Sequence, residues 1–310
     1  MERMLKLPDG QRLSPIGLGT AGLGVSWTDE NLLHRYLDEG GNVLDTARLY
    51  GWPEEIGRSE TLLGDFFARS GRREECVIVS KGGHPDMADL HTPRMDASAM
   101  ADDLHRSLRA LRTDRIDLYL YHRDDPATPA GELLEVMEGF RCAGKIRYYG
   151  CSNWTLPRME EAAAYARAHG LAGFTANECL FNYATDHASA PPDDTLVVAD
   201  APMRAWHRAN PDCLMLPYSG LAGGFFHKLL RAEDPTRLAS DWCYSDENLR
   251  RARRLRTLMQ ERGVSVSQAL LGYLLTRETP ALPLVSCSSM AHLTDALRTP
   301  ALGFRPEDFD

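Results

Sequence analysis

Three apolar runs in this chain each lead into side chains that can hold or transfer a proton. These side chains are Asp45, with Tyr50 shortly beyond it, Lys81 and His122. Buried strands that each deliver a polar residue at the carboxyl end are typical of an active site at the top of a parallel barrel. Carboxylate, phenol, amine and imidazole groups all serve proton transfer in enzymes. The pattern therefore predicts an enzyme.

Short apolar runs alternate with amphipathic stretches along the chain. The runs that predict strands lie at residues 16–19, 42–45, 77–80, 116–121, 147–151, 173–177, 214–218 and 282–286. Stretches with a helical pattern lie between them, at residues 30–39, 60–69, 97–111, 131–142, 156–169 and 246–262. Eight strands alternating with helices predict an α/β fold, the (β/α)8 or TIM barrel. Because no shift in composition divides the series, we expect a single domain over residues 1–310.

The residues before the first strand predict an N-terminal β-hairpin. Within residues 5–13, the dipeptide Asp9-Gly10 separates two alternating segments, and this dipeptide favours a two-residue hairpin turn. We expect the hairpin to close the bottom of the barrel, with a loose N-terminal arm as the alternative. Longer connections at residues 182–192 and 223–244 are expected to shape a ligand site, as long loops at a catalytic face often do.

Composition excludes several classes of partner. The 310 residues include 35 basic and 44 acidic side chains, and the net charge of −9 argues against nucleic acid or an anionic membrane. Residues 1–10 lack the apolar core of a signal peptide, and no uncharged run is long enough to span a membrane. The seven cysteines are never spaced C-x-x-C, which argues against disulfides and a zinc site. We expect a cytoplasmic protein that acts on a small molecule.

The glycines at residues 17–22 match G-x-G-x-x-G, the dinucleotide fingerprint of a doubly wound sheet. The eight repeating units argue against that fold, which has six strands and a reversal of strand order. A glycine-rich turn after the first barrel strand explains the run equally well.

A series of short motifs resembles the aldo-keto reductase family. The most specific is Gly-Asn-Val-Leu-Asp-Thr-Ala-x-x-Tyr-Gly at residues 41–51, followed by Ser-Glu-x-x-Leu-Gly at 59–64. Further motifs lie at residues 79–82, 117–122, 144–153, 218–224 and 286–293, in the family's order. The resemblance covers almost the whole chain. It implies a (β/α)8 barrel that binds a nicotinamide cofactor and acts on a small carbonyl or alcohol substrate.

By this resemblance, Asp45, Tyr50, Lys81 and His122 form a catalytic tetrad for the reversible reduction of an aldehyde or ketone to an alcohol. The reaction needs a hydride at carbon and a proton at the developing alkoxide. Tyr50 would donate the proton, with its pKa lowered by the ammonium of Lys81. Asp45 would hold that ammonium, and His122 would fix the carbonyl oxygen. Each residue has a structural alternative. In it, Asp45 caps the segment that follows, Tyr50 is an aromatic residue of a loop, Lys81 is a surface charge and His122 is a polar group with its hydrogen bonds satisfied.

The resemblance also implies the cofactor-binding residues. Ser152 and Asn153 match a pair that binds the nicotinamide carboxamide, and Phe181 matches an aromatic that stacks on the ring. Glu178 stands where the family usually has Gln, so it keeps an acceptor, loses a donor and, when ionised, favours the positively charged oxidised ring. The other residues assigned to the cofactor are Thr20, Asp45, Tyr218, Ser219, Leu221, Gly223, Ser286, Ser288, Ser289, His292 and Asp295.

The choice between the two nicotinamide cofactors depends on the last strand. Relatives commonly carry Arg or Lys where Ser288 and Ser289 stand, and those cations pair with the adenosine 2′-phosphate. Hydroxyl groups can still donate to phosphate, but without the charge-assisted contribution. We favour NADP(H) and leave NAD(H) open.

Aromatic residues predict the substrate pocket. We assign Trp27, Trp52 and Trp154 to it beside Tyr50 and His122, and such walls suit a sugar-like or aromatic carbonyl. Two other functions remain as alternatives. A nicotinamide-binding regulatory or redox-sensing subunit would not need the tetrad, and a sugar isomerase or metal-dependent lyase would need a compact metal motif that the sequence lacks. The oligomeric state cannot be predicted.

Overall fold

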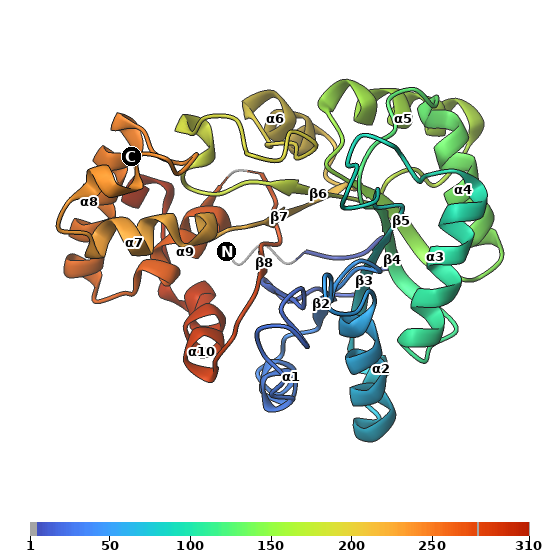
Figure 1. Ribbon diagram of the computed structural model, residues 1–310, viewed down its shortest axis with the longest axis horizontal. Helices are drawn as coiled ribbons and strands as arrows, with labels where there is room; N and C mark the ends of the chain where they lie inside the picture. The colour runs from blue at the N-terminus through green and yellow to red at the C-terminus, as the bar shows by residue number, and fades with distance from the viewer. Residues whose placement is uncertain (1–4, 278, 310) are drawn as a thin grey trace.

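Eight parallel strands form the centre of the computed structural model, which describes residues 5–277 and 279–309 (Figure 1). The strands are β1 (Gly17–Gly19), β2 (Val43–Asp45), β3 (Val77–Gly82), β4 (Ile116–Tyr121), β5 (Ile146–Ser152), β6 (Ala176–Leu180), β7 (Leu214–Tyr218) and β8 (Leu284–Val285). Their order is β7-β6-β5-β4-β3-β2-β1-β8. Leu282, just before β8, donates its backbone N–H to the carbonyl of Met215 on β7 at 2.9 Å. This contact closes the sheet into the predicted barrel.

Helices cover the outside of the barrel (Figure 1). They are α1 (Asn31–Asp38), α2 (Arg58–Ser70), α3 (Ala97–Ala110), α4 (Ala130–Cys142), α5 (Leu156–His169), α6 (Ala201–Ala209), α7 (Phe225–Arg231), α8 (Asp246–Arg262), α9 (Val266–Thr276) and α10 (Met290–Arg298). Short 3₁₀ turns are η1 (Arg73–Glu75), η2 (Thr185–His187), η3 (Ala222–Gly224), η4 (Pro235–Leu238), η5 (Thr299–Leu302) and η6 (Pro306–Phe309). Among the described residues, no helix is both long and apolar enough to cross a membrane.

The predicted boundaries agree closely with these elements, with one shift. The sixth strand begins at Ala176, three residues later than predicted, because Gly173 has a φ of +74° and cannot continue an extended strand. The buried polar pair Asn177 and Glu178 interrupts the apolar pattern that would have marked the strand. Helix α9 was not among the predicted helical stretches. Seven of its residues are buried, so its sequence has no clear amphipathic pattern.

Alternate residues of the strands point into the barrel, and this alternation positions the site. The inward apolar layer includes Val43, Val79, Leu120, Ala176, Leu216 and Leu284. Two residues further along each of these chain segments stand Asp45, Lys81, His122, Glu178, Tyr218 and Ser286. Because successive side chains of a strand alternate between its two faces, these polar groups point to the same side as the apolar layer.

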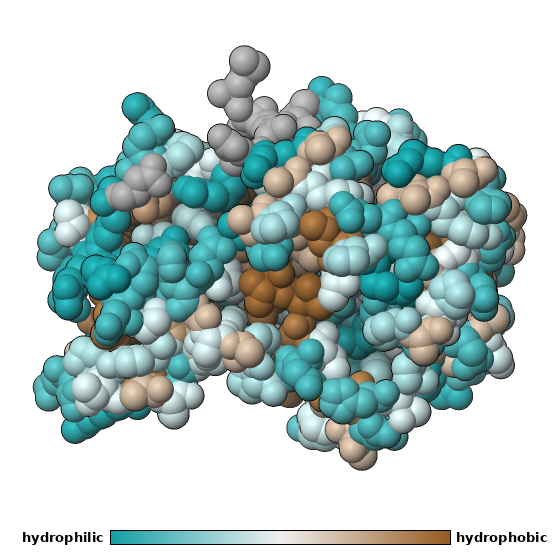
Figure 2. Space-filling model, turned by 90° about the horizontal axis from the view of Figure 1, so that it is seen from above, coloured by the Kyte–Doolittle hydropathy of each residue, from teal (hydrophilic) through white to brown (hydrophobic). Residues whose placement is uncertain are grey.

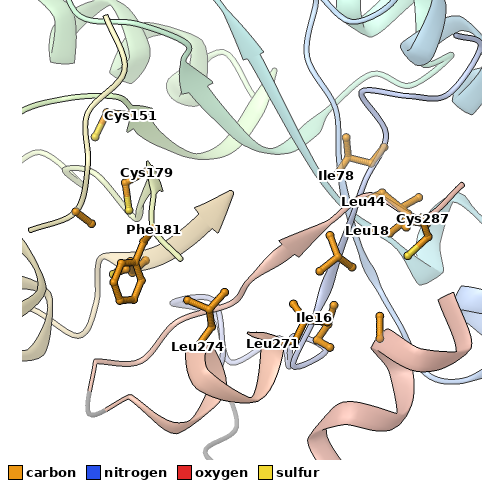
Figure 3. Close-up of a cluster of buried hydrophobic side chains, with 14 of the residues drawn as sticks. Ile16, Leu18, Leu44, Ile78, Cys151, Cys179, Phe181, Leu271, Leu274 and Cys287 are labelled. Atoms are coloured by element: carbon orange, nitrogen blue, oxygen red, sulfur yellow. The ribbon is translucent and has the colours of Figure 1, made fainter. Parts of the chain in front are cut away.

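A second apolar cluster lies between the strands and the surrounding helices. Leu18, Leu44 and Ile78 contribute from β1, β2 and β3, and Leu271 and Leu274 contribute from α9 (Figure 3). Figure 2 shows where apolar surface is visible from above: it gathers near the middle of that face, with mostly hydrophilic surface around it.

The predicted N-terminal hairpin is present. Lys6 and Arg12 form an antiparallel bridge, and Leu7 and Leu13 join the inward apolar layer at the bottom of the barrel. The turn differs from the predicted two-residue form. Leu7 accepts from the N–H of Gly10 at 2.9 Å, and Gly10 has a φ of +87°, which matches a three-residue loop with a left-handed glycine. Residues 1–4, part of the N-terminal segment in which no signal peptide is expected, lie outside the described residues.

The close approach of β5 and β6 depends on Gly150. A Cβ at this position would lie 2.2 Å from the carbonyl oxygen of Ala176 and 2.7 Å from Leu120 Cδ2. We expect Gly150→Ala to lower the free energy of unfolding by about 3 kcal/mol, because backbone atoms would have to move. Urea unfolding measures the change.

The matched control is Gly139→Ala in helix α4, where a Cβ meets no described atom within 4 Å. This change is expected to stabilise the protein by about 0.5–1 kcal/mol, because alanine favours the helix. Equal urea midpoints for the two variants would contradict the assigned role of Gly150.

Candidate active site

The polar residues at the carboxyl ends of the strands surround one cavity. Its lining residues are Gly19, Ala21, Asp45, Tyr50, His122, Arg123, Ser152, Asn153, Glu178, Leu196, Tyr218, Ser219, Leu284 and Ser286. The set includes three of the four predicted tetrad residues, and the fourth, Lys81, lies directly behind them. The barrel topology thus brings together side chains from distant parts of the sequence.

Lys81 is the centre of the site. Its Nζ is fully buried and donates to Asp45 Oδ1 at 2.5 Å, to the carbonyl of Thr46 at 3.0 Å and to the hydroxyl of Tyr50 at 3.2 Å. The Oε2 of Glu178 lies 3.1 Å from the same nitrogen. Burial opposes the charge, but the two carboxylates outweigh it and hold the pKa of Lys81 well above its usual value. The ammonium is therefore charged.

Tyr50 is held in its protonated form. Burial raises the pKa of the phenol, the ammonium of Lys81 lowers it, and the charges of Asp45 and Glu178 raise it again. Lys81 acts in the predicted direction, but the net shift is upward, opposite to the net shift expected from the sequence. Burial and the second carboxylate account for this difference.

His122 is neutral. Burial lowers its pKa well below the usual value, and the neighbouring His84, Lys81 and Arg123 lower it further. Its ring lies 6.0 Å from that of Tyr50 and 4.7 Å from that of His84, measured between centroids. Its Nδ1 is buried and bonds to no described residue. A neutral imidazole has one donor and one acceptor nitrogen, so it can bind a polar ligand in the cavity.

Glu178 is buried on β6, with 3% of its surface exposed, and lines the cavity. Its Oε2 makes no hydrogen bond of normal geometry to any described residue, although it lies close to Lys81. Burial, followed by the charge of Asp45, raises the pKa of Glu178 to about 8. The residue is therefore largely protonated at neutral pH in the structure.

Ser152 and Asn153 follow β5 at the cavity wall. Asn153 has a φ of +59°, and its Oδ1 accepts from the hydroxyl of Tyr218 at 2.6 Å and from the N–H of Val197 at 3.1 Å. Its Nδ2 donates to Ser152 Oγ at 3.0 Å. Ser219, beyond Tyr218, also lines the cavity and has a φ of +54°.

Other predicted cofactor residues extend away from the tetrad. Leu221 caps the turn η3, and Gly223 lies within that turn with a φ of +59°. On the far side, Ser289 caps helix α10, and Ser288 Oγ lies 3.4 Å from Nδ1 of His292. Asp295 lies further along α10, where its carbonyl accepts from Thr299.

Four further predicted residues, Thr20, Phe181, Trp154 and Trp27, are buried and do not line the cavity. Thr20 is buried beside it, where its hydroxyl donates to the carbonyl of Asp45 at 2.9 Å. Phe181 lies in the apolar cluster (Figure 3), with the guanidinium of Arg204 4.7 Å from its ring centroid. Trp154 is fully buried behind β4 and β5, stacked near Tyr121.

Trp27 is also buried in the apolar cluster. The assignments of Trp27 and Trp154 to the substrate pocket are therefore not supported by their positions. Trp52 does line a second cavity, together with Lys81, Gly82 and His84. An aromatic residue next to a site motif can pack into the core as readily as into a pocket, and sequence position alone does not distinguish the two.

Arg123 and His84 were not assigned to the site. Arg123 lines the cavity and donates to Thr195 Oγ1 at 2.8 Å and to Asp193 at 3.2 Å, so it anchors the loop after β6. Both residues lie in short polar segments that directly follow the third and fourth predicted strands, and this position was the signal in the sequence that could have identified them. Among residues 5–277 and 279–309, no group of three or more His, Cys, Asp or Glu side chains is arranged to hold a metal ion.

Glu60 on α2 is a buried acid outside the cavity lining. It accepts a hydrogen bond from Ser80, next to Lys81, at 2.7 Å, and its other oxygen lies 3.8 Å from the guanidinium of Arg48. Burial raises the pKa of Glu60 to about 7. The folded protein therefore keeps a proton here that the unfolded chain loses at lower pH.

Comparisons with known proteins agree with this architecture. The sequence model of the aldo/keto reductase family matches residues 15–310. An uncharacterised oxidoreductase of Bacillus subtilis is 27% identical over 300 residues, 93% of this chain and 88% of that protein. An aryl-alcohol dehydrogenase of Pestalotiopsis microspora is 32% identical over 189 residues, 56% of this chain and 48% of that protein.

A solved structure shows the same fold. It is an aldo/keto reductase of Klebsiella pneumoniae in complex with NADP and acetate, with a TM-score of 0.71 and 23% sequence identity. The match covers 97% of this chain and 90% of that chain.

Glu60 generates a prediction about stability. An unperturbed glutamate titrates near 4.5, so the free energy of unfolding should fall as pH rises from about 4.5 to about 7, by up to about 3 kcal/mol from this group. Glu60→Gln cannot titrate and should lose this part of the pH dependence. Urea unfolding across this range tests it, with Glu160→Gln on the exposed face of α5 as control. The same slope in wild type and Glu60→Gln would refute the assignment.

Proposed function

This chain belongs to the aldo/keto reductase family, and from that premise we propose that it is an NADP(H)-dependent oxidoreductase. It reduces an aldehyde or ketone to an alcohol, reversibly, with Tyr50 as the proton donor. The observation that carries the proposal is the convergence of Asp45, Tyr50 and His122 around the buried ammonium of Lys81 at one cavity.

The polar groups of the cavity fit a nicotinamide cofactor. The carboxamide of the nicotinamide has one acceptor oxygen and one N–H₂ donor group. The cavity wall contains the hydroxyl of Ser152, the amide of Asn153 and the carboxyl group of Glu178. The Oε2 of Glu178 has no hydrogen-bond partner among the described residues. When bound, the cofactor supplies or accepts the hydride. The structure of the Klebsiella pneumoniae relative was determined with NADP, which supports the same cofactor here.

The tetrad residues transfer the proton to the substrate oxygen. Tyr50 retains its proton because burial raises its pKa, so it is in the form that donates a hydrogen bond to a carbonyl oxygen. As negative charge develops on that oxygen, the proton moves to it, and the ammonium of Lys81, 3.2 Å away, stabilises the phenolate left behind. Asp45 keeps Lys81 charged and in position through the 2.5 Å hydrogen bond.

His122 positions the substrate oxygen. Because it is neutral, it adds no charge that would compete with Lys81, and an N–H of the ring can donate to the same carbonyl oxygen. Its backbone N–H donates to the carbonyl of Gly82 at 2.9 Å, which fixes the start of the loop after β4.

The substrate is proposed to be an aromatic or sugar-like carbonyl compound. The second cavity, which includes Trp52 and His84, borders Lys81 and offers an aromatic wall with polar neighbours. The relative from Pestalotiopsis microspora is named for aryl alcohols, which supports the aromatic class.

Replacement of Tyr50 tests the proposal. We expect Tyr50→Phe to lower kcat for an activated aromatic aldehyde by at least about a thousandfold, because the proton donor is lost. Binding of NADPH, followed by fluorescence titration, should change by less than about threefold. Tyr148→Phe, at the bottom of β5, is the control for loss of a hydroxyl group and should keep full activity. Wild-type turnover in Tyr50→Phe would refute the assignment.

The cofactor choice has its own test. We expect the wild type to use NADPH with a lower KM than NADH, with the exposed Ser288 and its neighbour Ser289 contributing hydroxyl donors. Ser288→Arg should lower the KM for NADPH by up to about tenfold and leave that for NADH unchanged, because it adds a charge-assisted contact to the 2′-phosphate. Ser288→Ala is the control for loss of the hydroxyl group alone. An equal gain with NADH would show that this residue does not face the phosphate.

A further inference from the structure

Glu178 gives this cavity an uncommon charge balance. One buried ammonium, Lys81, faces two buried carboxyl groups, at 2.5 Å from Asp45 and 3.1 Å from Glu178. If both carboxyl groups were ionised, the cluster would carry one negative charge in excess. A buried charge without a partner is strongly unfavourable, so either a proton or a cation must balance it.

The two carboxyl groups are not equivalent. Asp45 accepts a short hydrogen bond from Lys81, whereas the Oε2 of Glu178 accepts no normal hydrogen bond from the described residues and borders the cavity. Both residues line the cavity, so a ligand can reach either one, and the Oε2 of Glu178, which accepts no normal hydrogen bond from the described residues, can carry the balancing proton. Its neighbour Cys179 lies in the apolar cluster instead (Figure 3).

Asp45 competes with Glu178 for the balancing proton, because burial also raises the pKa of Asp45, but the charge of Lys81 and its short hydrogen bond to Asp45 oppose that rise. The surrounding ionisable groups that line the cavity or its back wall are Asp45, Tyr50, Lys81, His122, Arg123 and Tyr218. Lys81 keeps its proton because the charge of Asp45, and that of Glu178 once it is ionised, raise its pKa, and burial raises the pKa of both tyrosines. Burial lowers the pKa of His122, so it stays neutral. The pKa of Glu178 itself is raised to about 8, close to neutrality.

We propose that Glu178 matches the charge of the cavity to the redox state of the cofactor. It is protonated in the free protein and beside the reduced, neutral nicotinamide, and it releases its proton when the oxidised, cationic nicotinamide binds. The inference rests on the proposed function. A nicotinamide ring that exchanges hydride with a carbonyl group hydrogen-bonded to Tyr50 must lie in the cavity that Glu178 borders. In each state the sum of ring, Lys81, Asp45 and Glu178 charges is zero.

The sign of the effect follows from linkage. A cation beside Glu178 favours its carboxylate, so binding of NADP⁺ lowers the pKa of Glu178 and releases a proton. The affinity for NADP⁺ therefore rises with pH until the pH exceeds the pKa of Glu178 in the free protein, which is about 8. The affinity for NADPH lacks this contribution. The phosphate groups titrate in both cofactors, so their effect cancels in the ratio of the two Kd values.

Calorimetric titration in two buffers of different ionisation enthalpy measures the protons released on binding. For the wild type we expect about half a proton or more per site with NADP⁺ at about pH 7, and much less with NADPH. Glu178→Gln should release none with NADP⁺ and should bind it about tenfold more weakly than wild type at about pH 9, while its Kd for NADPH stays within about threefold.

Glu60→Gln is the matched control, because Glu60 is also a fully buried glutamate but lies outside the cavity lining. It should release protons as the wild type does. Equal proton release for NADP⁺ and NADPH in wild type, or unchanged release in Glu178→Gln, would overturn the proposal for Glu178 and leave the reductase function standing. Failure of the wild type to bind either cofactor would overturn the proposed function, and this inference with it.

A measurement on the wild type alone covers the case in which Glu178→Gln does not fold. The ratio of Kd for NADP⁺ to Kd for NADPH should fall about tenfold between about pH 6 and about pH 9. A ratio that stays constant over this range would overturn the proposal without any variant.

Discussion

The ammonium of Lys81 is the constraint on which the rest of the site depends. It has no exposed surface, so its charge has to be balanced inside the protein. The partners come from β2, β6 and the turn after β2, and an unpaired charge at this depth would destabilise the fold by about 3–5 kcal/mol. Correct strand order and register are therefore required before the charge is balanced, which couples folding of the barrel to assembly of the site.

The regularity of the barrel explains how much the sequence could predict. Inward and outward residues alternate along each strand, and parallel strands end at the same side, so polar residues at strand ends must meet. This argument correctly brought Asp45, Lys81 and His122 together although they are far apart in sequence. The hairpin that closes the bottom was predictable for the same reason, from alternating apolar residues around a turn.

Residues whose role depends on side-chain direction were harder to predict. Trp154 and Phe181 lie beside site residues in sequence, yet both are in the core, where Trp154 donates to the carbonyl of Arg123 and Phe181 packs beneath Arg204. The choice between core and cavity depends on which face of a strand or turn a residue occupies. A difference of one position reverses that choice, and loops have no regular alternation from which to infer it.

Electrostatic states were the least predictable, because they depend on burial and on partners from other strands. Sequence alone suggested that Lys81 lowers the pKa of Tyr50, and it does, but desolvation raises that pKa by more. The resemblance to the family implied that Glu178 stands in place of a Gln, whereas its distance of 3.1 Å from Lys81 could not be predicted from the sequence. Because of that distance, a carboxyl group at this position affects the charge of the whole cluster around Lys81. Under the proposed function, a single oxygen in place of an amide nitrogen links the proton on Glu178 to the proton donor Tyr50, because both side chains contact the same ammonium.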